Sequence, residues 1–294
     1  MLGRDVDNGK NHPMSNGGFR IGVVAPGARI EPVIAERVKA VAADLYPVRT
    51  PDIHFHPQCF LASGHVAGDD AARADAFAEV ADDPAFDALW FARGGYGACR
   101  LAAALLPRLS DTARDKAYLG YSDAGSLLGA LYNDGYTRLA HGPMPVDIDR
   151  DGGAAAVERA LRFLVDHDPD ALEPSITPGT KTAAFNLTIL SQLLGTPFEP
   201  DLSDHVLMLE DVSEHMYRID RALFHITSNP GIRRVAGIRL GRVSDIPSND
   251  PDFGQSEEDV FRHWCGVSGI PYLGRADIGH DAANKVVPFG PPNG

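Results

Sequence analysis

Two apolar runs of strand length, residues 88–92 and 117–121, most restrict how this chain can fold. The first run stops at a glycine-rich segment, residues 93–97 (RGGYG), and the second stops at Ser122, just before a helical pattern. Strands that alternate with helices pair in parallel through right-handed crossovers. The sequence therefore predicts an α/β fold whose functional residues lie beyond the carboxyl ends of parallel strands.

Hydrophobic periodicity predicts the individual elements. In the first part of the chain it predicts strands over 20–26, 88–92 and 117–121 and one ending at 141, and helices over 31–46, 69–81, 125–132 and 154–167. In the second part it predicts helices over 187–194, 216–228 and 256–267, and strands over 205–209, 235–243 and 272–278. Residues 50–66 have no clear period.

Composition shifts predict the domain boundaries. The start of the chain is polar and glycine-rich, which is typical of a disordered leader, and residues 168–182 contain three prolines and little periodicity, which is typical of a linker. The expected segments are a disordered leader (1–19, with Met1 or Met14 as the true start), an N-terminal domain with the nucleophile (20–167), a linker (168–182) and a C-terminal domain (183–294).

Charge and cysteine content limit the partners. With 27 basic and 40 acidic residues, the formal charge of −13 disfavours binding to nucleic acid or anionic membranes. Cys59, Cys99 and Cys265 are far apart and fit no disulfide framework, so we expect a reducing, cytoplasmic location. His54 and His56 could share one face of a strand, but they lack a third ligand, so we expect no metal site. No apolar stretch approaches the ~18 residues of a membrane-spanning helix.

Ser122 is the candidate nucleophile. A strand-to-helix turn exposes its hydroxyl at a helix N-terminus, and the nearby Gly94 and Gly95 can turn their N–H groups toward a bound oxygen. A serine hydrolase needs this combination of a nucleophile and oxyanion donors. Serine is also a common helix cap, and Cys99 is a rival nucleophile whose helical spacing favours a small buried residue. The glycine segment lacks the spacing of a nucleotide-binding loop.

A serine nucleophile needs a base and an orienting acid. An apolar run, residues 206–209, ends in Glu210 and Asp211, and the last predicted strand ends near His280. His141 also follows a strand, and residue chemistry alone cannot separate it from His280. Three other histidines fall in helical patterns, which are more typical of surface or core residues: His215, His225 and His263.

Several motifs resemble the LD-carboxypeptidase family, the S66 serine peptidases that trim murein tetrapeptides. The first three are RGGYG (93–97), GYSD (120–123) and HGPM (141–144). The likeness continues through Asn186-Leu187, residues 194–196, residues 209–212 with Glu214, residues 217–221, Gly279-His280 and residues 288–290. Each motif alone is modest, but their order and spacing over residues 22–290 are highly specific.

The resemblance implies a catalytic triad of Ser122, Glu210 and His280, with the oxyanion held by the backbone amides of Gly95 and Asp123. It also implies an N-terminal domain that is flavodoxin-like or glutamine-amidotransferase-like, and a C-terminal swivelling β/α domain that carries the acid and the base. Proteins of this family are cytoplasmic homodimers without a metal or other cofactor. The expected reaction is hydrolysis of the LD peptide bond of a murein tetrapeptide, with release of D-alanine.

Some residues depart from the family pattern. Gly27 stands where the family usually has serine, and Ala184-Phe185 replace a usual Gly-Gly, so the peptide preference stays open. Arg93 is a candidate to bind the free carboxylate of the substrate, although an arginine before a glycine loop can also brace that loop.

Two other functions fit parts of the pattern. Serine peptidases that give immunity to peptidyl-nucleotide antibiotics of the microcin C type resemble this chain around Ser122, but they lack the RGGYG form. A non-catalytic binding protein that retains the cleft is the second alternative. The RGGYG segment favours murein peptides over the first alternative, and retention of the biological activity in Ser122→Ala would indicate the second.

Overall fold

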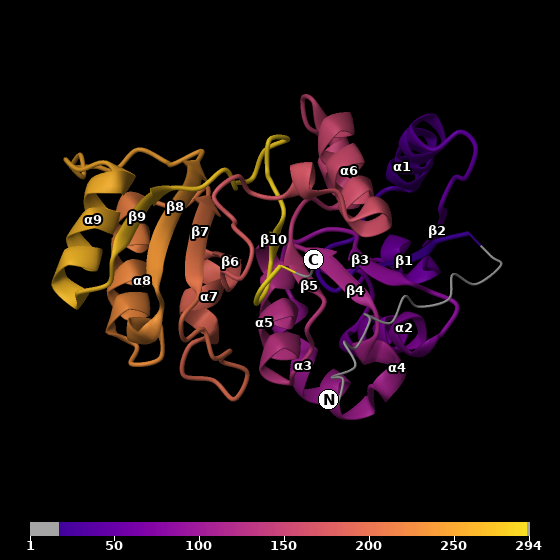
Figure 1. Cartoon of the computed structure of the whole chain (residues 1–294), viewed down its shortest axis with the longest axis horizontal. Coiled ribbons are helices and arrows are strands. Elements are labelled where there is room, and N and C mark those ends of the chain that lie inside the picture. The colour runs from indigo at the N-terminus through magenta and orange to yellow at the C-terminus, as the bar shows by residue number, and fades with distance from the viewer. Residues whose placement is uncertain (1–17, 293–294) are drawn as a thin grey trace, which may run out of the picture.

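A mainly parallel β-sheet and a fully parallel one, each packed against helices, lie side by side along the long axis of the molecule (Figure 1). The structure is a computed structural model that describes residues 18–292. The predicted α/β class is therefore confirmed. Of the leader predicted over residues 1–19, residues 1–17 lie outside the described residues. Within the described part, every helix is too short or too polar to span a bilayer.

The first sheet has six strands in the order β10-β5-β4-β3-β1-β2. They are β1 (Arg20–Val24), β2 (Asp52–Phe55), β3 (Ala88–Phe91), β4 (Ala117–Gly120), β5 (Leu139–His141) and β10 (Val287–Pro288). All neighbours pair in parallel except β10, which runs antiparallel to β5. β3 and β4 are buried along their whole length, because helices cover both faces of a parallel sheet.

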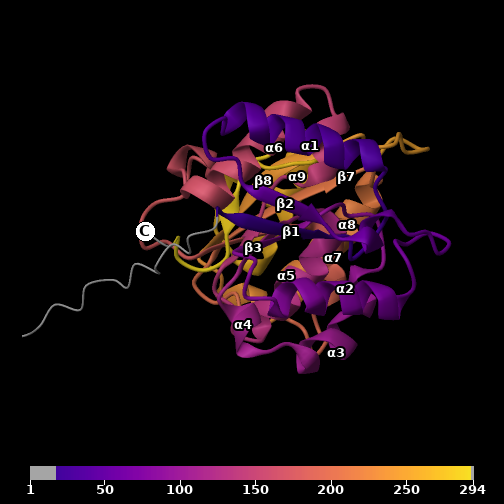
Figure 2. The ribbon, with the colours of Figure 1, turned by 90° about the vertical axis from the view of Figure 1, so that its right-hand side faces the viewer.

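Helices cover the two faces of the first sheet (Figure 2). On one face lie α1 (Pro32–Leu45) and α6 (Gly153–Leu161), and on the other lie α2 (Asp70–Asp82), α4 (Asp111–Arg114) and α5 (Gly125–Asn133), with α3 (Ala102–Leu105) beside them. The helix predicted over 154–167 continues past α6 as a π-helical turn, residues 162–166.

The second sheet has four parallel strands in the order β6-β7-β8-β9. They are β6 (Thr182–Asn186), β7 (Val206–Val212), β8 (Gly237–Ser244) and β9 (Tyr272–Arg275). The helices of this half are α7 (Leu187–Leu193), α8 (Met216–Ser228) and α9 (Glu257–Ser268). They agree with the predicted helices to within one residue at each end.

Some strands differ from the prediction. β2, β6 and β10 were not predicted, because their sequences lack the run of large apolar residues that marks β3 and β4. The strand predicted over 272–278 ends at Arg275, just after Gly274 takes a positive φ of 87°. The strand predicted to stop at 209 continues to Val212, so Glu210 lies within β7 rather than after it.

β10 brings the end of the chain back to the first sheet. Val287 pairs with His141, and Pro288 pairs with Ala140. The loop that carries His280 therefore leaves the second sheet at β9 and enters the first sheet at β10. This path places His280 at the junction of the two sheets.

Candidate active site

Ser122 lies on a strained corner. β4 ends at Gly120, and Ser122 begins a 3₁₀ turn that leads directly into α5. Its φ is 60°, a left-handed conformation that is uncommon for a residue with a side chain and recurs at functional corners. A nucleophile elbow has this geometry, which pushes the serine hydroxyl out beyond the end of its strand.

The glycine segment packs directly over this corner. A Cβ atom added to Gly94 would lie 2.8 Å from the Ser122 Oγ atom, so only glycine permits this approach. Gly95 has a φ of 97°, which favours glycine. The Gly95 N–H has no acceptor among the hydrogen bonds of residues 18–292, so it is free to act as a donor to a ligand.

Hydrogen bonds with two side chains, Arg73 and Asp123, hold the glycine segment (residues 93–97) and the residue after it in place. Arg73 is buried and donates hydrogen bonds to the carbonyl oxygens of Gly97, at 2.9 Å, and Pro26. The Asp123 carboxylate accepts the Ala98 N–H at 2.9 Å, which ties the corner after β4 to the loop after β3. Burial raises the pKa of Asp123, and backbone amides partly oppose that rise. Asp123 is at the second position of its 3₁₀ turn, where a backbone N–H lacks an acceptor within the helix.

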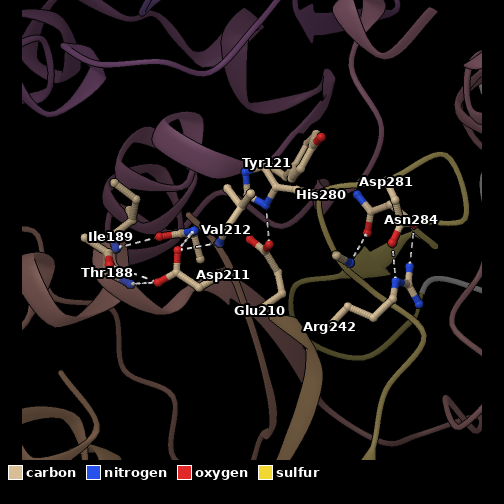
Figure 3. Close-up of polar contacts among 12 residues, drawn as sticks. Tyr121, Thr188, Ile189, Glu210, Asp211, Val212, Arg242, His280, Asp281 and Asn284 are labelled. Atoms are coloured by element: carbon tan, nitrogen blue, oxygen red, sulfur yellow. Dashed lines mark hydrogen bonds and ion pairs between the residues drawn. The ribbon is translucent and has the colours of Figure 1, made fainter. Parts of the chain in front are cut away.

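Glu210 and His280 form a buried acid–histidine pair (Figure 3). The Nδ1 atom of His280 is hydrogen-bonded to the Oε2 atom of Glu210, whose side chain is fully buried. The register of β7 against β8 shifts between Leu209 and Asp211, so Glu210 sits at an irregularity in the strand. Burial lowers the pKa of His280, but the charge and hydrogen bond of Glu210 outweigh it, and the pKa is raised overall.

Asp211 has a different role from its neighbour Glu210. It accepts hydrogen bonds from the Asn186 amide at 2.8 Å, and from the backbone and hydroxyl of Thr188 at 3.1 and 2.9 Å (Figure 3). These contacts join β7 to the start of α7. Asp211 is therefore a structural anchor, and Glu210 is the carboxylate available to the imidazole.

Ion pairs hold the loop that carries His280. Arg242, on β8, donates to both carboxylate oxygens of Asp281 (Figure 3). It also pairs with Asp277. The Gly279 N–H donates to the Asn284 side chain at 3.1 Å. Sequence reasoning missed these contacts, because an arginine in a strand gives no signal of its partner in another segment.

His141, the rival base, is placed differently. It is 1% exposed, and its Nε2 atom has no hydrogen-bond partner within the described residues. Burial lowers its pKa to about 4, so the imidazole is neutral near pH 7. The structure pairs His280 rather than His141 with the carboxylate.

The other candidates lie apart from this pair. His215 stacks on Tyr217, His225 lies on α8, and His263 lies on α9 against Trp264. His56 accepts the Gln58 N–H, whereas the His54 ring lies against Phe86. Cys99 is exposed rather than buried as its helical spacing predicted, because it lies in the short turn before α3. Desolvation still raises the pKa of its thiol, which weakens it as a nucleophile.

Tyr121 connects the two halves of the candidate site. Its ring centroid lies 4.8 Å from that of His280, and it directly precedes Ser122 in the chain. None of the hydrogen bonds among residues 18–292 joins Ser122 to His280. The structure thus brings the predicted acid and base together, and it places the base beside the serine corner.

A serine on a strained strand-to-helix turn and a buried histidine–carboxylate pair, set on two parallel sheets, are features of the α/β serine peptidases. Residues 21–142 match the LD-carboxypeptidase N-terminal domain, and residues 181–292 match the LD-carboxypeptidase C-terminal domain. The chain belongs to this family, S66, which is a family of serine peptidases.

Similar proteins span nearly the whole chain. A protein of Streptomyces coelicolor that carries a carboxypeptidase name is 33% identical, over 94% of this chain and 89% of its own length. The murein tetrapeptide carboxypeptidase of Pseudomonas aeruginosa is 26% identical, over 92% of this chain and 91% of its own length.

Solved structures share the fold. The muramoyltetrapeptide carboxypeptidase from Oxalobacter formigenes has a TM-score of 0.74 and 23% identity, over 92% of this chain and 93% of that chain. The microcin C7 self-immunity protein bound to aspartyl sulfamoyl adenosine also has a TM-score of 0.74, with 18% identity, over 94% of this chain and 92% of that chain. At these identities the likeness establishes the fold alone.

Proposed function

We propose that this protein is a serine LD-carboxypeptidase that releases the terminal D-alanine of murein tetrapeptides. The observation that carries the proposal is the buried Glu210–His280 pair, which lies beside the corner that bears Ser122. A neutral imidazole whose Nδ1–H is held by a carboxylate presents Nε2 as a base. The names of the Pseudomonas and Oxalobacter proteins support the substrate class.

The proposed mechanism assigns one role to each group. His280 takes the Ser122 proton through Nε2, and the hydroxyl oxygen attacks the carbonyl carbon of the LD bond. The amides of Gly95 and Asp123 stabilise the negative charge that develops on the carbonyl oxygen. His280 then protonates the leaving nitrogen, D-alanine departs, and water hydrolyses the acyl-enzyme. Glu210 keeps the imidazole in one tautomer and stabilises its cation.

The cellular setting is also a proposal. The three isolated cysteines support a cytoplasmic location, and the negative charge disfavours nucleic acid and membrane as partners. Membership of the family supports a homodimer that acts on murein peptides. The two family matches, residues 21–142 and 181–292, leave residues 143–180 between them, which supports a domain division close to residues 168–182. Phe185, which replaces a family glycine, is fully buried between the two halves, where it packs against Phe289.

A second function has one observation in its favour. The microcin C7 self-immunity protein, solved with an aminoacyl sulfamoyl nucleoside, is as similar in fold as the carboxypeptidase structure. In that alternative the same serine would cleave an aminoacyl-adenylate type of bond. The RGGYG segment of this chain favours the murein peptide.

The deciding experiment measures D-alanine release from free and UDP-linked tetrapeptides, beside cleavage of an aminoacyl adenylate analogue. We expect release from the tetrapeptide, and a kcat lowered by roughly 10⁴- to 10⁶-fold in Ser122→Ala. Ser248→Ala, at an exposed serine in the loop after β8, is the matched control. Cleavage of the analogue alone would support the immunity-type function. An active Ser122→Ala variant would show that Ser122 is not the nucleophile.

A further inference from the structure

The ring of Tyr121 contacts both His280 and His141, the two candidates for the base. Its centroid lies 4.8 Å from the His280 ring at an interplanar angle of 57°, and 5.4 Å from the His141 ring at 62°. Figure 3 shows Tyr121 beside the Glu210–His280 pair. Tyr121 is 1% exposed and directly precedes Ser122. One short backbone corner therefore carries both this ring and the proposed nucleophile.

The buried Asp147 carboxylate and the Arg150 guanidinium hold the far end of this ring. The Tyr121 hydroxyl donates to the Oδ1 atom of Asp147 at 2.8 Å, and Arg150 donates to the same oxygen at 2.7 Å. Arg150 also donates to the tyrosine oxygen at 3.3 Å. The other oxygen of Asp147 accepts the Met144 N–H at 2.8 Å. These bonds hold the hydroxyl and thereby restrict movement of the Tyr121 ring away from His280.

The hydrogen bonds of the Tyr121 hydroxyl indicate a role beyond core packing. Asp147 is 1% exposed, and a buried carboxylate is costly unless charged partners and hydrogen bonds compensate it. An aliphatic side chain would fill the space of Tyr121 without such an anchor. Burial raises the pKa of Tyr121 well above its usual range, so the phenol stays protonated and does not act as a base.

We propose that Tyr121 is a positioning residue that sets the plane of the His280 imidazole. The hydrogen bond to Glu210 holds the Nδ1 atom, but a hydrogen bond tolerates a range of angles, so small changes in χ1 and χ2 can still tilt the ring. A flat, anchored ring packed against the imidazole restricts that tilt. Nε2 is then held toward the Ser122 corner. This inference rests on the proposed function, because it concerns the orientation of the proposed base.

Kinetics of D-alanine release test the role of the ring. Tyr121→Leu removes the flat surface, and we expect kcat to fall by about 100-fold with KM within about threefold, as for a misoriented catalytic group. Tyr121→Phe keeps the ring and loses the anchor, so it restores kcat to within about 10-fold of wild type. Tyr118→Leu, at a buried tyrosine on β4 whose hydroxyl bonds to the Ala113 carbonyl, is the matched control for lost volume. A folded Tyr121→Leu variant with wild-type kcat would overturn the proposal.

A substrate-free measurement separates this inference from the proposed function. NMR of the His280 Nδ1 proton and of the His280 pH titration, in a Ser122→Ala background, reports the imidazole directly. We expect Tyr121→Leu to shift and broaden that resonance and to move the titration, and Tyr118→Leu to leave both in place. If Tyr121→Leu does not fold, Tyr121→Phe, which keeps the ring but loses the hydrogen bond to Asp147, must produce a smaller shift of the same resonance. Unchanged His280 signals refute the role of Tyr121, whereas a wild-type enzyme inactive on tetrapeptides refutes only the proposed function.

Discussion

The Nδ1 atom of His280 is hydrogen-bonded to the Oε2 atom of Glu210, although 70 residues separate them in the chain. Glu210 comes from an interior strand of the second sheet, and His280 comes from the loop that crosses to the first sheet. Arg242 fixes this loop through Asp277 and Asp281. The geometry of the pair therefore depends on how the two sheets and this loop pack together.

Glu210→Gln should lower kcat by about 10³- to 10⁴-fold, because an amide cannot stabilise the imidazolium and favours the wrong tautomer. D-alanine release and thermal unfolding are measured together. Glu36→Gln, at an exposed glutamate on α1, is the control for loss of a carboxylate. A Glu210→Gln variant with wild-type kcat would remove Glu210 from the mechanism.

Gly94→Ala should abolish most activity while the protein stays folded. The added methyl group would lie 2.8 Å from the Ser122 Oγ atom and 2.9 Å from its Cβ atom, so the hydroxyl must move. We expect kcat to fall by roughly 100-fold or more, as misplacement of a reacting group costs about this much. Gly266→Ala, on α9 with open space around it, is the control and should be fully active. Equal activity of the two variants would show that the corner tolerates the displacement.

The pH dependence of kcat/KM should report His280. Its pKa is raised above the usual 6.5, because the Glu210 carboxylate outweighs the effect of burial. The base must be neutral to act, so activity should rise with pH through a midpoint above 6.5. Glu210→Gln removes the negative charge, so the residual kcat/KM of this variant should rise with pH through a lower midpoint than in the wild type. A midpoint below that of a free imidazole would contradict the assigned pair.

Stability should fall as the pH is lowered, because of His141. Its pKa is about 4 in the folded protein, against 6.5 when unperturbed, so between these values the unfolded chain binds the proton and the folded chain does not. The free energy of unfolding should therefore decrease from pH 6.5 to 4, by up to about 3 kcal/mol from this residue. Urea titrations of wild type and His141→Asn measure the slope. An unchanged slope in His141→Asn would assign the acid sensitivity to other groups.

Arg93→Lys tests whether Arg93 binds the substrate carboxylate. Arg93 is exposed, donates to the Arg29 carbonyl at 3.3 Å, and forms no ion pair within residues 18–292. If it binds the carboxylate, loss of the guanidinium fork should raise KM about tenfold with kcat retained. Steady-state kinetics and thermal unfolding are compared. A lower melting temperature with an unchanged KM would mean that Arg93 only braces the glycine segment.

Local sequence determined much of this protein. The apolar runs at β3 and β4 and the residues that end them are local signals, and they predicted the serine corner and the glycine segment. The amphipathic patterns predicted α8 and α9 to within one residue. Parallel strands place their carboxyl ends at one edge of a sheet, so these signals also indicated where the site would lie.

Only the tertiary structure decided which histidine meets the carboxylate. His141 and His280 both follow strands, and their chemistry is the same. Within residues 18–292, His141 is buried and its Nε2 atom has no hydrogen-bond partner. The loop before β10 instead carries His280 past Glu210 on its way to pair with β5. A two-residue strand is too short to show periodicity in the sequence. It forms only because its backbone hydrogen-bonds to a distant segment of the chain. For that reason the contact between acid and base could not be derived from the residues alone.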